Sequence, residues 1–85
     1  MKTAVKNRKS EIHELKSFIE KMLSDFSVTG KTIIPSEPDN EGDYYIIVYA
    51  DNIKSFPKAI DIEKKIQKII RGKFGDKFLI SIIPK

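Results

Sequence analysis

Residues 44–50 read YYIIVYA, and this stretch decides how the rest of the chain is arranged. Aromatic and β-branched residues fill it up to the closing alanine, which predicts a β-strand. Side chains in a strand alternate between two faces. One face carries Tyr45, Ile47 and Tyr49, and the other carries Tyr44, Ile46, Val48 and Ala50. Neither face is polar, so we expect both to be covered in the folded protein.

Turn-forming residues come before this strand. Residues 36–43, SEPDNEGD, contain four acidic residues and nothing apolar, which predicts an exposed loop. Before the loop, residues 28–35, VTGKTIIP, predict a second strand that Gly30 weakens at its start and Pro35 ends. Two adjacent strands joined by such a loop most simply form an antiparallel hairpin.

Two amphipathic helices are predicted on either side of the hairpin. From Ser10, which can cap a helix, apolar residues recur at spacings of three and four. They are Ile12, Leu15, Phe18, Ile19, Met22, Leu23 and Phe26. The second helix is expected to start at residues 55–57, where a serine precedes a tolerated proline, and to stop at Gly72. Its apolar stripe consists of Ala59, Ile62, Ile66, Ile69 and Ile70.

A last strand is predicted at residues 77–84, which completes the order α-β-β-α-β. The right-handed rule for strand-helix-strand connections puts this strand parallel to the second strand or next to the first. Two short helices cover only one face of a sheet. We therefore expect one α+β domain at residues 10–85, after a basic flexible tail at residues 1–9. The architecture is a three-stranded mixed sheet with two helices on one face, a ferredoxin-like or split two-layer sandwich.

The second face of this sheet predicts a partner. Covering a few hundred Å² of apolar surface is worth several kcal/mol at roughly 25 cal/mol per Å², before the costs of association. We expect a homodimer that forms through the residues Tyr45, Ile47, Tyr49, Phe78, Ile80 and Ile82. Two alternatives remain open at this point. The amino-terminal tail covers the face, or the tyrosines simply expose their hydroxyl groups to water.

The residues that carry catalytic chemistry are scarce. The chain has no cysteine, and its single histidine, His13, lies beside the apolar stripe of the first helix. These features predict no enzyme, cofactor or metal site. Asp39, Glu41 and Asp43 alternate around Gly42, but they do not complete a twelve-residue calcium loop between two helices, so we expect a solvated loop. No run of eighteen apolar residues and no signal-like start is found, so a cytoplasmic protein without a membrane segment is expected.

Positive charge gathers in the second half of the chain, where residues 51–85 hold nine lysines and arginines against four acids. Nucleic-acid binding is therefore the alternative function, because each neutralised phosphate releases counterions. Its candidate residues are Lys64, Lys68, Arg71, Lys73 and Lys77. The competing interpretation is a helix face that only keeps the protein in solution.

Two known families share parts of this pattern. Gly72, Lys73, Phe74 and Gly75 form a G-x-x-G sequence that resembles the backbone-clamping loop of K-homology RNA-binding domains. That family continues with a helix, whereas Asp76 here leads into a strand. The order α-β-β-α-β is also similar to the cytoplasmic domain of cation diffusion facilitator transporters, which dimerises. The metal-binding histidines of that family are absent, so the second resemblance implies dimerisation alone.

Overall fold

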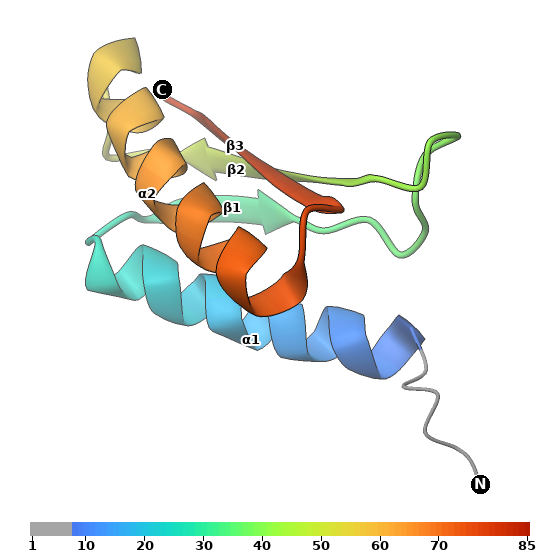
Figure 1. The fold of residues 1–85 in the computed structure, drawn as a ribbon. Coiled ribbons are helices and arrows are strands. Elements are labelled where there is room, and N and C mark those ends of the chain that lie inside the picture. The colour runs from blue at the N-terminus through green and yellow to red at the C-terminus, as the bar shows by residue number, and fades with distance from the viewer. Residues whose placement is uncertain (1–7) are drawn as a thin grey trace, which may run out of the picture.

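The computed structural model describes residues 8–85 and confirms the predicted order of elements (Figure 1). The helices are α1 (Arg8–Asp25) and α2 (Phe56–Phe74), and the strands are β1 (Gly30–Ile33), β2 (Tyr44–Ala50) and β3 (Phe78–Ile83). Residues 8 and 9 belong to α1 rather than to the predicted tail, and the rest of that tail lies outside the described residues. No helix within residues 8–85 has the length and apolar character needed to cross a membrane.

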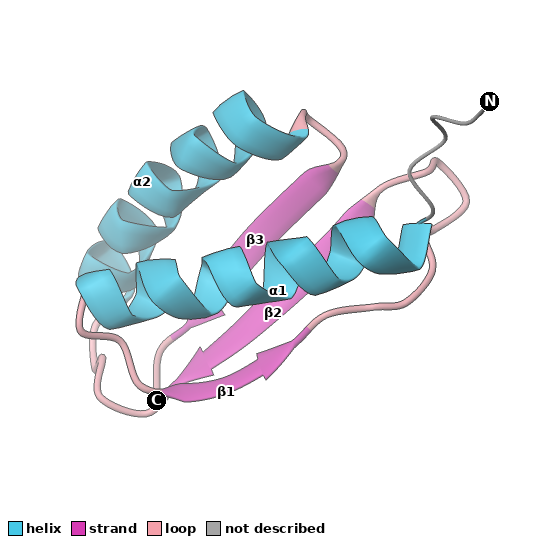
Figure 2. Ribbon diagram, turned by 90° about the horizontal axis from the view of Figure 1, so that it is seen from below, coloured by secondary structure: helices cyan, strands magenta, loops and turns pink. Residues whose placement is uncertain are grey.

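The three strands form one mixed sheet in the order β1-β2-β3. β1 is antiparallel to β2, as expected for the hairpin, and β3 is parallel to β2. The first of the two predicted positions for the last strand is therefore the observed one. Both helices lie on the same side of the sheet, and the other side has no helix over it within the described chain (Figure 2).

The core lies between this sheet and the two helices. Its sheet side is built from neighbouring pairs across β2 and β3, Tyr44 with Phe78 and Ile46 with Ile80, and all four side chains are buried. The helices contribute the fully buried residues Leu15, Ile19, Ala59, Ile66 and Ile70. A helical stripe on one layer and alternate strand positions on the other thus supply the apolar surface that holds the fold together.

The start of α2 agrees with the prediction, but its end does not. Ser55 caps the helix, and its Oγ accepts a hydrogen bond from the Lys58 amide at 3.4 Å. The helix continues through Gly72 and ends at Phe74, and Gly75 caps it with a positive φ of 96°. Phe74 explains the extra residues, because its ring packs edge-on against Phe18, with the centroids 5.4 Å apart. This packing favours the additional helical residues 72–74 over the glycine stop.

Candidate functional site

The uncovered side of the sheet is a largely apolar surface, which we call the open face. Strand register places its members side by side, because residues paired across strands point to the same side. Its apolar members are Ile33, Tyr45, Ile47, Tyr49, Leu79 and Ile83. Tyr45 is 48% exposed, Tyr49 45%, Ile33 43% and Ile83 38%. Such exposure of four large apolar side chains in one continuous patch is unusual for a small domain that remains alone.

Three of the predicted interface residues lie on the opposite side of the sheet. Phe78, Ile80 and Ile82 are at most 4% exposed and belong to the core under the helices. Grouping them with the tyrosines was wrong. The register pairs Tyr45 with Leu79 and not with Phe78. The open face therefore keeps Tyr45, Ile47 and Tyr49 from the prediction and takes Leu79, Ser81 and Ile83 from β3.

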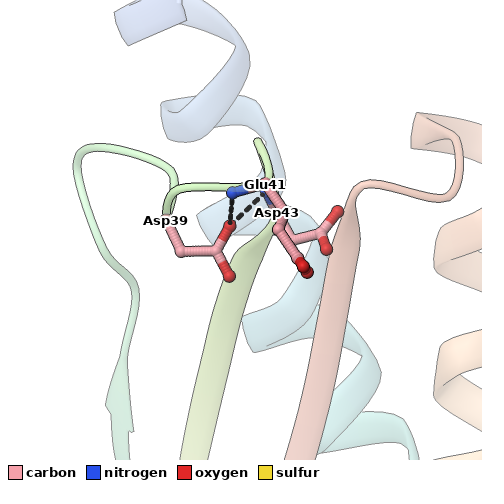
Figure 3. Close-up of side chains that lie close together, drawn as sticks. All are labelled: Asp39, Glu41 and Asp43. Atoms are coloured by element: carbon pink, nitrogen blue, oxygen red, sulfur yellow. Dashed lines mark hydrogen bonds between the residues drawn. The ribbon is translucent and has the colours of Figure 1, made fainter.

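The acidic loop lies at one end of the open face (Figure 3). Carboxylate oxygens of Asp39, Glu41 and Asp43 all lie within 4.8 Å of one another. Asp39 uses its Oδ1 to close the loop, accepting hydrogen bonds from the amides of Glu41 at 2.8 Å and Asp43 at 2.9 Å. Loss of solvent around the phenol, together with the negative charges of Asp39, Asp43 and Glu41, raises the pKa of Tyr45. This end of the face is thus negatively charged.

The opposite end of the open face carries a positive charge. Lys31 pairs with Tyr49 across β1 and β2, so its exposed side chain lies on the same side of the sheet. Ile47 lies on β2 between Tyr49 and the acidic loop, and its side chain is apolar. The open face therefore has an apolar centre between ends of opposite sign.

The predicted cationic residues divide into two groups. Lys64, Lys68 and Arg71 line a groove of about 480 Å³ beside β3. Lys73 lies elsewhere, with its Nζ over the Phe18 ring at 5.3 Å from the centroid. Lys77 also lies outside the groove, and its Nζ is 3.9 Å from a carboxylate oxygen of Asp43. Three cations remain together as a candidate phosphate-binding surface.

The Gly72–Gly75 segment does not form the loop of a K-homology domain. Three of its four residues are helical, and the chain passes from Gly75 through a turn into β3. Lys73 and Phe74 are engaged with the Phe18 ring. The segment therefore ends a helix and contributes to packing, and no second helix follows it in the described chain.

Sequence reasoning missed the role of two polar residues on α2. Gln67 accepts a hydrogen bond from the Ile80 amide and donates one to the Phe78 carbonyl, both at 2.8 Å. Glu63 accepts from the Ile82 amide at 2.8 Å. These two side chains occupy the outer edge of β3. Their spacing of four residues beside the buried stripe is the only signal that the sequence offers for this role.

His13 is exposed on α1. Comparisons with models of known protein families, with curated proteins and with solved structures found no match to this chain. The surfaces of the molecule therefore carry the functional argument.

Proposed function

We propose that this chain is a non-enzymatic interaction module that self-associates by packing its open face against the same face of a second copy. The observation that carries the proposal is the patch centred on Tyr45, Ile47 and Tyr49, which the helices leave uncovered. Two such sheets can stack with their strands nearly aligned and about 10 Å apart, as in a β-sandwich. Each copy then supplies the second layer that the other lacks.

The apolar content of the open face supports a stable contact. At roughly 25 cal/mol per Å², removing a few hundred Å² of apolar surface from water gives several kcal/mol before the costs of association. Tyrosine suits such a contact, because it combines a large apolar ring with a hydroxyl group that tolerates water at the rim.

The distribution of charge supports an antiparallel arrangement of the two copies. A two-fold axis that runs across the strands brings the acidic end of one open face to the end that carries Lys31 in the other. The alternative arrangement, in which equal ends of the two faces meet, would place the carboxylates of one copy next to those of the other. These carboxylates are Asp39, Glu41 and Asp43. Opposite charges at the rim mainly set the relative orientation of the two copies and their rate of association, while the apolar centre supplies the affinity.

The test is the mass of the protein in solution, measured by light scattering over a range of concentrations. Tyr49→Lys adds a second positive charge beside Lys31 on the open face and is expected to lower the association constant at least a hundredfold. Ile69→Lys is the matched control, since Ile69 is 41% exposed but lies on α2. A Tyr49→Lys protein whose mass equals that of the unchanged protein would remove the proposal.

A second candidate function is binding of a nucleic acid, which the gathering of Lys64, Lys68 and Arg71 along one groove favours. Contacts of these side chains with phosphates would weaken steeply as salt concentration rises. Labelled RNA and DNA can be titrated at two salt concentrations against the unchanged protein and a Lys68→Glu, Arg71→Glu variant. Binding at low salt that the variant loses supports this function, and equal behaviour of the two proteins contradicts it.

A further inference from the structure

The outer edge of β1 differs from that of β3, because no described residue pairs with it. β1 is a terminal strand of the sheet, and its inner side pairs with β2. The Asp51 amide donates to the Thr29 carbonyl at 2.9 Å, which fixes residue 29 as one whose backbone faces β2. In an antiparallel pair such residues alternate with residues that face away. The backbone groups of Gly30 and Thr32 therefore point outward, and the same alternation assigns Ile34, which directly follows β1, to the outward set.

A groove of about 960 Å³ runs along this edge, between β1 and α1. Gly30, Thr32 and Ile34 line it from the strand, and Ile12 and Leu23 contribute apolar surface from the helix. Unpaired strand edges with an adjacent groove are sites where an additional strand can bind through its backbone. The groove accepts the side chains of that strand that point toward the helices.

We propose that β1 pairs in antiparallel fashion with β1 of a second copy, across a two-fold axis that passes between the two Thr32 residues perpendicular to the sheet. The edge is complementary to itself in this register. Thr32 of one copy lies opposite Thr32 of the other, and Gly30 lies opposite Ile34, so all outward backbone groups of the three residues meet donors or acceptors. Gly30 presents no side chain opposite Ile34 of the second copy.

The charges along α1 support the choice of a second copy as the occupant. Lys16 and Glu20 both line the groove, and neither forms an ion pair with another residue in the range 8–85. The proposed two-fold axis runs the two α1 helices in opposite directions beneath the joined edge. Lys16 of each copy then faces Glu20 of the other, which gives two equivalent ion pairs.

This edge contact uses a different surface from the open-face contact and does not depend on it. Edge pairing joins two sheets of three strands into one sheet of six, whose open faces lie on the same side. If both contacts form, two such joined sheets stack and close a tetramer with perpendicular two-fold axes. If only the edge contact forms, the protein is a dimer with a large exposed face.

Thr32→Pro tests the edge contact directly. The Thr32 amide faces away from β2, so a proline at this position removes no hydrogen bond to β2. Proline is accepted in edge strands in this orientation. We expect the variant to halve the mass measured by light scattering, while Thr32→Val, which keeps the amide, leaves the mass unchanged. Circular dichroism checks that the variant is folded. If a folded Thr32→Pro protein keeps the mass of the unchanged protein, the edge proposal is wrong.

Charge exchange on α1 provides a second test at exposed positions. Lys16→Glu should weaken association about tenfold, because two ion pairs become repulsive contacts. The double variant Lys16→Glu, Glu20→Lys should recover the original association constant. Equal association of all three proteins would contradict the predicted helix arrangement and thereby overturn the edge proposal.

The two self-association proposals give different results in these experiments. A mass that falls with Thr32→Pro but not with Tyr49→Lys supports the edge and removes the open face. The reverse result removes the edge. A protein that is monomeric throughout, or one whose β1 edge binds an unrelated extended peptide without self-pairing, overturns the choice of a second copy.

Discussion

The two outer edges of the sheet are finished in different ways. Along β3, helix side chains bond to three outward backbone groups: Gln67 bonds to the Phe78 carbonyl and the Ile80 amide, and Glu63 bonds to the Ile82 amide. Along β1, the outward groups of Gly30, Thr32 and Ile34 have no partner among residues 8–85. Proteins usually blunt exposed edges, because open edges pair with other chains. The comparison teaches that this chain covers part of one edge with its own side chains and leaves the other edge unpaired within residues 8–85.

The two sides of the sheet repeat this contrast. The side under the helices is dry, and Ile46 and Ile80 are at most 4% exposed there. The open face presents Tyr45 and Tyr49 to solvent from the same strand. Among residues 8–85, the side of the sheet without a helix therefore lies next to the unpaired edge.

The largest effect on stability is expected from a change at the start of β1, the strand that forms the unpaired edge. Gly30 has φ of 145°, and a Cβ added there would lie 1.9 Å from the Tyr49 carbonyl oxygen. Gly30→Ala should therefore separate the start of β1 from β2 and lower the free energy of unfolding by about 3 kcal/mol. Urea denaturation measures the loss.

Gly72→Ala is the control for that experiment. Gly72 lies inside α2, with no atom within 4 Å of an added Cβ. The substitution should raise the free energy of unfolding by about 0.5 kcal/mol or more, since alanine favours a helix over glycine. If Gly30→Ala is as harmless as this control, the tight pairing of Gly30 with β2 is not as described.

A smaller effect on stability is expected when the side chain that bonds to the β3 edge is removed. Gln67→Ala removes the one side chain that bonds to both the Phe78 carbonyl and the Ile80 amide. It should lower the free energy of unfolding by about 2 kcal/mol. The Ile80 amide should also exchange with deuterium faster. Lys68→Ala, next to it on α2 but exposed, should change stability by less than about 0.5 kcal/mol. Equal stability of the two variants would show that the glutamine does not seal the edge.

The smallest effect on stability is expected at the start of α2, the helix that carries Glu63 and Gln67. Ser55→Ala removes the side-chain acceptor of the Lys58 amide and should cost about 1 kcal/mol at the start of α2. Ser55→Asp keeps an acceptor at the cap and should lose little. Thermal denaturation of the three proteins distinguishes the results, and a stable alanine variant would mean that the cap contributes nothing measurable.

The sequence predicted the elements better than their relative positions. Residues 44–50 matched β2 at both ends, because aromatic and β-branched residues are bounded there by Asp43 and Asp51. Alternation also gave the two faces of β2 correctly and placed Phe78, Ile80 and Ile82 of β3 together on one face. It could not tell which face of β3 continues which face of β2, since that depends on register across the strands, and Phe78 was therefore assigned to the wrong side.

Contacts between distant residues account for the other differences. Gly72 is a plausible helix stop by itself, yet the packing of Phe74 on Phe18 carries α2 on to Phe74. The sealing of β3 by Gln67 needs a helix that lies directly along that edge. The open edge of β1 likewise follows from the order of the strands, which short sequence patterns leave undetermined.

Amide hydrogen exchange of Thr32 and Ile80, followed by NMR at increasing protein concentration, tests the central contrast most directly. Both amides point away from β2, and Ile80 has its partner within the chain. We predict that Ile80 is protected at every concentration and that protection of Thr32 rises as copies associate. Rapid exchange of Thr32 at all concentrations, including those at which the protein is associated, would contradict the account.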